Sequence, residues 1–178
     1  MNQVAKRKKK PAGASPGSVV YVGAEKTTPV SITRIRYSHE GAEAPSVVSA
    51  QECRPSSSSL GVTWYTVDGV HDVEILKALG DNFGLHPLVV EDIGNTTQRP
   101  KMEDFEGYCF IAAKMISYET KTAQVVSEHI SIVWGEGFVV LFLEGSRDLF
   151  APIRQRIESG KGRIRKNGSD YLVYALVD

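Results

Sequence analysis

Three consecutive strand-like runs in the second half of the chain constrain its fold more than any other feature. They cover residues 108–118, 125–134 and 138–143 and are rich in β-branched and aromatic side chains. A polar connection around residues 119–123 separates the first two runs, and Gly135-Glu136-Gly137 separates the last two. Short connections of this kind are typical of antiparallel hairpins. The sequence therefore predicts an antiparallel meander.

Helical patterns flank this meander on both sides. Before it, apolar residues recur at helical spacing from Val73 to Phe83 and stop at Gly84, and Pro87 then opens a second short helix. After it, similar spacing predicts a helix that ends at Gly160, and a last helix begins near Ser169. Further strands are expected at 19–22, 30–37 and 62–67, whereas 38–61, with the run Ser56–Ser59, predicts a loop or a short irregular helix.

The last predicted helix is still apolar at Asp178, where the sequence stops without a Gly, Asn or Pro to end it. A chain terminus that belongs to a complete domain usually frays through polar residues. We therefore expect 1–178 to be part of a longer protein, with the rest of this helix beyond Asp178.

Composition limits the classes of function. The 178 residues are 42% hydrophobic, which suits one globular domain, and 21 basic residues balance 21 acidic ones. Five of the cations lie in 6–10, so the sequence predicts a disordered basic tail over 1–17 and a mildly acidic domain over 18–178. A net charge of zero argues against a dedicated nucleic-acid binder. The acidic domain instead suits a cation or a basic surface as its partner.

Metal and catalytic signatures are sparse. Cys53 and Cys109 are far apart with no metal-ligand spacing, so neither a disulfide scaffold nor a structural zinc site is expected. The four histidines do not cluster, and no nucleophile elbow, phosphate loop or dinucleotide fingerprint is present. The sequence therefore predicts no catalytic residue and no enzyme.

The segment His86-Pro87-Leu88-Val89-Val90-Glu91-Asp92 is the densest functional pattern, and Asn95 and Gln98-Arg99-Pro100-Lys101 follow it. Asp92 comes three residues after Val89 and therefore borders the apolar side of the predicted helix. A carboxylate there is a candidate ligand for a hard cation such as Mg²⁺. The alternative is a solvated helix edge or an ion pair with Arg99, and because surface ion pairs are common, the pattern alone favours this alternative.

This segment, 86–101, closely resembles the CorA family of divalent-cation transporters. Members show His-Pro-Leu, Glu-Asp-Ile, Asn and Gln-Arg-Pro-Lys at the same spacing, and the likeness extends over residues 16–178. The resemblance implies an α/β fold, an α/β/α sandwich with a mixed, largely antiparallel sheet between helical layers. It also implies the N-terminal cytoplasmic domain of a protein of the inner (plasma) membrane. In the family a stalk helix and two membrane spans follow, and five copies surround a pore.

The resemblance also implies site residues. Asp92 aligns with the family carboxylate that binds regulatory Mg²⁺ at the subunit interface, and Glu91 and Asp178 align with a neighbouring cation site. The ion implied is Mg²⁺, with Co²⁺ or Ni²⁺ as alternatives, and its role is to hold a homopentamer closed. Gly94 departs from the apolar residue of many relatives, and we expect it to loosen the helix that carries Asp92.

Two other functions remain open at this stage. The chain could belong to a zinc-transporting relative, which Cys53 or His86 as ligands would favour. It could instead be a soluble metal-dependent hydrolase that uses His86, Glu91 and Asp92, although a hydrolase needs ligands that converge in a cleft.

Overall fold

A computed structural model describes residues 13, 15–55, 61–120, 122–145 and 149–178. One seven-stranded sheet forms its centre, with the strand order β2-β1-β3-β7-β6-β5-β4. Strands β3 and β7 pair in parallel and every other neighbouring pair is antiparallel, so the sheet is mixed. The strands are β1 (Ser31–Ser38), β2 (Ser46–Val47), β3 (Gly61–Asp68), β4 (Lys101–Phe105), β5 (Tyr108–Glu119), β6 (Gln124–Gly135) and β7 (Phe138–Leu143).

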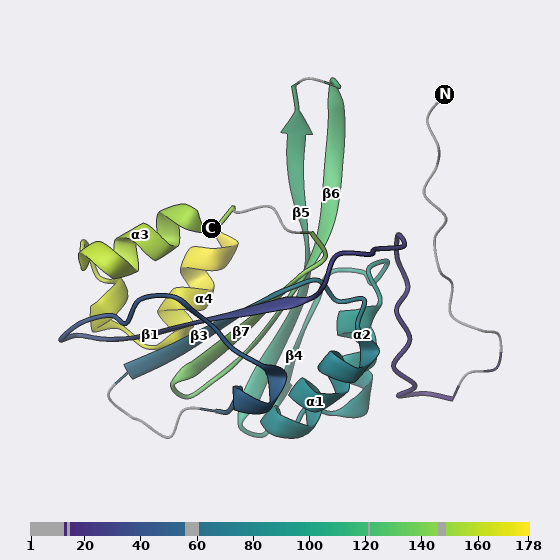
Figure 1. The fold of residues 1–178 in the computed structure, drawn as a ribbon, viewed down its shortest axis with the longest axis horizontal. Coiled ribbons are helices and arrows are strands. Elements are labelled where there is room, and N and C mark those ends of the chain that lie inside the picture. The colour runs from purple at the N-terminus through teal and green to yellow at the C-terminus, as the bar shows by residue number, and fades with distance from the viewer. Residues whose placement is uncertain (1–12, 14, 56–60, 121, 146–148) are drawn as a thin grey trace.

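Helices cover both faces of this sheet (Figure 1). On one face lie α1 (Val73–Phe83) and α2 (Pro87–Gly94), with the short 3₁₀ helix η1 (Ala50–Glu52) beside them. On the other lie α3 (Ala151–Ser159) and α4 (Ser169–Val177), with the 3₁₀ helix η2 (Ile164–Lys166). The expected α/β/α sandwich is confirmed.

Alternation along the central strands explains why both faces are covered. All six residues of β7 are buried. Val140 and Phe142 belong to the core under α1 and α2, whereas Val139 and Leu141 belong to the core under α3 and α4. Because successive side chains of a strand point to opposite faces, a strand that is apolar throughout requires a cover on each side.

The meander is confirmed as well. Strands β5, β6 and β7 pair in sequence order, with Trp134 opposite Cys109 on one side and Val139 on the other. The far end of the β5–β6 hairpin extends beyond the rest of the sheet (Figure 1). Helices α1 and α3 end where expected, since Gly84 and Gly160 adopt left-handed φ values of 62° and 66° that stop a helix.

Two expectations about the strands need correction. Residues 19–22 form no regular strand, because Val22 makes only an isolated bridge with Asn95 at the end of α2. The sequence pattern does not predict strands β2 and β4, and β2 lies with η1 in the stretch expected to be a loop or an irregular helix. The basic run 6–10 and the serine run 56–59 lie outside the described residues.

None of the helices in the described ranges has both the length and the hydropathy that a membrane crossing requires.

Candidate functional site

Helix α2 positions the two candidate carboxylates. Pro87 occupies its first turn, and the His86 side chain accepts a hydrogen bond from the Leu88 N–H at 3.3 Å, which caps the helix. Its apolar side, Val89, Val90, Ile93 and Gly94, is buried against the core. Glu91 and Asp92 are partly buried at the edge of that side. The helix therefore places both carboxylates at the border between core and solvent.

Strand β4 runs alongside α2 in the opposite direction. The His86 ring stacks on Phe105 at a centroid distance of 6.1 Å, and the Asp92 carboxylate meets Lys101 at the other end. In the burial pattern of β4, Lys101, Glu103 and Phe105 are the less exposed positions, and the residues between them face solvent. Alternation thus brings Lys101 and Glu103 to the side that faces α2.

Lys101 joins two carboxylates at this place. Its Nζ lies 2.6 Å from Asp92 Oδ2 and 2.8 Å from Glu103 Oε2. The same ammonium lies 5.7 Å from the centroid of the Phe110 ring. Burial by itself lowers the pKa of Lys101, but the hydrogen bonds and charges of Asp92 and Glu103 outweigh it, so the pKa is raised overall. The ammonium therefore remains charged and balances Asp92. The sequence suggests an ion pair between Asp92 and Arg99, but in the structure Asp92 forms its ion pair with Lys101.

Glu91 has a different partner. One of its oxygens, Oε2, accepts a hydrogen bond from the Gly17 N–H at 2.7 Å. This contact joins the first described residues of the chain to α2. Glu91 and Asp92 are therefore adjacent in the chain but make separate contacts.

Asp178 lies at the end of α4, in the other helical layer. The buried residues Leu172 and Leu176 of α4 belong to the core on the far side of the sheet from α2, and the C-terminal end is well away from α2 in Figure 1. Glu91 and Asp92 are thus neighbours on α2 with separate partners, and Asp178 lies apart from both. Within the described ranges, no three or more His, Cys, Asp or Glu side chains gather where they could hold a metal ion.

Comparison with known proteins decides the family. The family model described as CorA-like Mg2+ transporter protein matches residues 59–178. The chain belongs to this family. It is 37% identical over 166 residues to the cobalt/magnesium transport protein CorA of Thermotoga maritima, a match that covers 93% of the chain and 47% of that protein. The chain therefore spans about half the length of this CorA relative.

Solved structures show the same fold. The full-length CmaX protein superposes with a TM-score of 0.64 at 14% identity, over 82% of this chain and 43% of that one. The CorA magnesium transporter of Methanocaldococcus jannaschii gives a TM-score of 0.54 at 16% identity, over 84% of this chain and 43% of that one. At such low identity these matches support the CorA-type architecture alone.

The residues that would favour a zinc-transporting CorA relative have structural partners. Cys53 is fully buried, its thiol donates to the Ser49 carbonyl at 3.4 Å, and burial raises its pKa to about 11. A zinc ligand must be a thiolate, and this environment disfavours that form. His86 is occupied as the cap of α2. Neither side chain is arranged as a ligand.

The arrangement also does not converge as a hydrolase site would. His86 and Asp92 lie at opposite ends of α2, about 9 Å apart along the helix axis for six residues at the usual rise. The His86 ring packs on Phe105 and the Asp92 carboxylate on Lys101.

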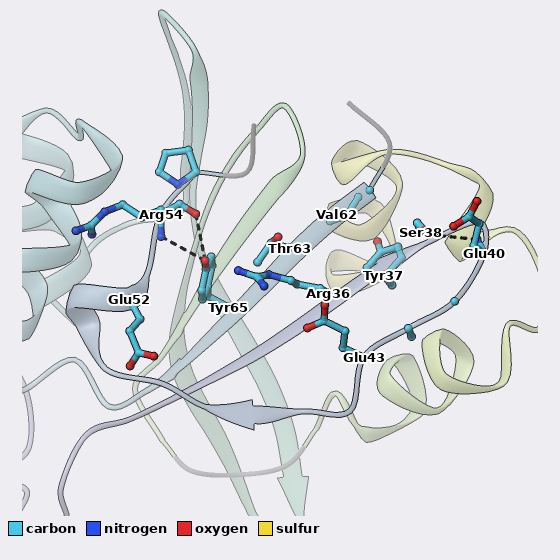
Figure 2. A pocket seen from close by; sticks show the side chains of 14 residues that line it. Arg36, Tyr37, Ser38, Glu40, Glu43, Glu52, Arg54, Val62, Thr63 and Tyr65 are labelled. Atoms are coloured by element: carbon cyan, nitrogen blue, oxygen red, sulfur yellow. Dashed lines mark hydrogen bonds between the residues drawn. The ribbon is translucent and has the colours of Figure 1, made fainter. Parts of the chain in front are cut away.

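A separate polar recess of about 840 Å³ lies over β1, β3 and the segment after η1 (Figure 2). Arg36 and Glu43 lie near its centre, and the Tyr65 hydroxyl donates to the Arg54 carbonyl at 3.1 Å. The sequence does not mark these residues as a site, since they lie on separate segments without a motif. Both acidic and basic side chains line the recess, and its described residues include no group that could hold a metal ion.

Proposed function

We propose that residues 18–178 form the cytoplasmic, Mg²⁺-sensing domain of a CorA-type magnesium and cobalt transporter. The observation that carries this proposal is the 37% identity, over 93% of the chain, to the cobalt/magnesium transport protein of Thermotoga maritima. In this proposal the pore and the spans in the inner (plasma) membrane belong to the part of the transporter that the chain does not cover. The domain regulates transport and is not an enzyme.

The donor chemistry at α2 fits a regulatory Mg²⁺. Mg²⁺ binds hard oxygen ligands, takes one or two carboxylates and keeps several waters. Asp92 provides such a carboxylate, and 16% of its side chain remains exposed beside Lys101. Asp92 would hold the regulatory ion from one subunit, together with a carboxylate of a neighbouring one, whereas Glu91 and Asp178 would contribute to a neighbouring cation site. Co²⁺ and Ni²⁺ are alternative ions for the same oxygens.

The placement of Asp178 determines how many copies of the chain its proposed cation site needs. Helices α2 and α4 lie on opposite faces of the sheet, each packed on its own core. The sheet lies between the two helices of one chain and keeps them apart. A cation site that joins Glu91 to Asp178 therefore needs two subunits, as in the proposed homopentamer.

Carboxylates that meet across such an interface repel each other. Two unit charges about 4 Å apart, in an environment with an effective dielectric constant of about 20, repel by about 4 kcal/mol before screening. Bound Mg²⁺ supplies the positive charge that cancels this repulsion and holds the ring closed. At low Mg²⁺ the acids separate, the interfaces loosen and the pore opens. Repetition at five interfaces strengthens the effect on a two-state equilibrium.

The test uses the complete transporter that carries this chain. We expect Mg²⁺ to protect it from proteolysis, and Asp92→Asn or Asp92→Ala to abolish that protection. Asp104→Asn is the matched control, because Asp104 is an exposed carboxylate on the solvent side of β4 and its replacement removes the same charge. Protection that persists unchanged in both Asp92 variants would contradict the proposal.

A further inference from the structure

The pairing of Lys101 with two carboxylates points to regulation of the Asp92 site, and this inference rests on the proposed role of Asp92. We propose that Lys101 is an internal counter-ion that competes with the divalent cation for Asp92. When the cation binds, Lys101 leaves Asp92 and stays paired with Glu103. The chain would thus contain its own competitor, which sets the concentration of Mg²⁺ at which the site fills.

The distances support competition for the same atom. Lys101 Nζ lies 2.6 Å from Asp92 Oδ2, slightly closer than is usual for a charge-assisted hydrogen bond between an ammonium and a carboxylate. A cation that uses this oxygen must displace the ammonium. Because the Asp92 side chain is only 16% exposed, solvent screens the pair less than it would screen a fully exposed one. Displacement therefore reduces the affinity of Asp92 for any added cation.

Glu103 provides the position to which Lys101 retreats. Its Oε2 lies 2.8 Å from the same Nζ, and 41% of its side chain is exposed, against 29% for Lys101. The three side chains are thus ordered from the more buried Asp92 to the more exposed Glu103. A small outward movement of the ammonium leaves Asp92 without leaving Lys101 unpaired. This arrangement reduces the cost of releasing Asp92.

The first test removes the competitor. Lys101→Gln keeps a hydrogen-bond donor but loses the charge, and we expect the Mg²⁺ concentration for half-maximal protease protection of the complete transporter to fall about tenfold. Lys101→Met, which removes the donor too, should shift it in the same direction. Lys77→Gln is the matched control. Lys77 forms an ion pair of 2.9 Å with Glu74 on α1, so its loss changes the net charge equally, and the midpoint should stay within twofold.

The second test has the opposite sign. Glu103→Gln removes the alternative partner, so Lys101 should hold Asp92 more firmly and the midpoint should rise about threefold. Asp104→Asn is the control for the loss of a nearby negative charge. In the double variant Lys101→Gln/Glu103→Gln, the second change should have little further effect, because Glu103 acts through Lys101. An equal shift with and without Lys101 would overturn the role given to Glu103.

A second readout separates this inference from the proposed function. Mg²⁺-dependent thermal stabilisation, measured for each variant against its own melting temperature without Mg²⁺, reports binding even when a variant is less stable. If the unaltered transporter gains neither protection nor stability from Mg²⁺, the proposed function fails. If it does gain them through Asp92, but Lys101→Gln leaves the midpoint unchanged or raises it, the competition is refuted and the proposed function stands.

Discussion

Replacing a helical glycine by alanine should have opposite effects on the stability of this chain at Gly80 and at Gly94. Gly80 lies within α1, where a Cβ would be 2.7 Å from Cγ2 of Val90 on α2. Gly94 is the last residue of α2, and a Cβ there would be 3.4 Å from Leu76 Cδ1 and from the Val20 carbonyl oxygen. The first distance is a collision and the second is an ordinary contact. Close packing of α1 on α2 thus explains the glycine inside α1.

The expected magnitudes follow from two opposing effects. Alanine is favoured over glycine in a helix interior by about 1 kcal/mol. At Gly80 this gain is outweighed, because Val90 is buried and β-branched and has few alternative rotamers, and overpacking a core costs about 1–3 kcal/mol. We expect Gly80→Ala to lower the free energy of unfolding by about 1 kcal/mol. Gly94→Ala, at a helix end with room for the methyl group, should raise it by about 0.5 kcal/mol.

Urea and thermal unfolding of the purified chain, followed by circular dichroism, measure both changes. A difference of 1 kcal/mol corresponds to about 2–4 °C in melting temperature for a chain of this size. The Val90→Ala background is the decisive control, since it removes the colliding methyl groups, and there Gly80→Ala should stabilise the chain. A Gly80→Ala variant as stable as the unaltered chain would refute the collision. The collision would also be refuted if Gly80→Ala lowered the free energy of unfolding by the same amount in the Val90→Ala background.

Two further predictions concern the burial of titratable side chains. Burial, with a smaller effect of Lys114, lowers the pKa of His129 to about 4, so the unfolded chain binds the proton more readily. The stability that comes from neutral His129 is fully present above the unfolded-state pKa of about 6.5 and is lost as the pH falls toward 4. Urea unfolding should therefore show a decrease of about 2 kcal/mol in the free energy of unfolding between about pH 7 and about pH 5. His129→Gln should remove this decrease. Equal losses in both proteins would refute this role. Cys109 is partly exposed and Cys53 is buried, so a thiol reagent should label the folded chain once, and Cys109→Ser should eliminate the label; persistent labelling would place Cys53 within reach.

The parts of the fold that sequence predicts best are those whose pattern does not depend on distant partners. The meander carries its own alternation and its own short connections, so strands β5, β6 and β7 could be placed in order. Strand β4 is different. Its sequence, Lys-Met-Glu-Asp-Phe, is mostly polar, and it becomes a strand because it pairs with β5, with Met102 opposite Ile111. Residues 19–22 show the opposite. Their composition is typical of a strand, but they form none, and the Val22 N–H donates a hydrogen bond to the Gly94 carbonyl at the end of α2. Tertiary pairing outweighs local propensity in both.

The candidate site follows the same rule. The motif around Asp92 could be recognised from its order of residues, but its counter-ion could not. Arg99 and Lys101 both follow Asp92 closely in sequence, and neither is placed by helical spacing. The choice is made by β4, which begins at Lys101 and presents alternate residues to α2. A shift of one residue in the register of β4 with β5 would turn Met102 toward Asp92 and Lys101 toward solvent. The motif therefore identifies the carboxylate, whereas the edge strand β4 determines which cation balances its charge.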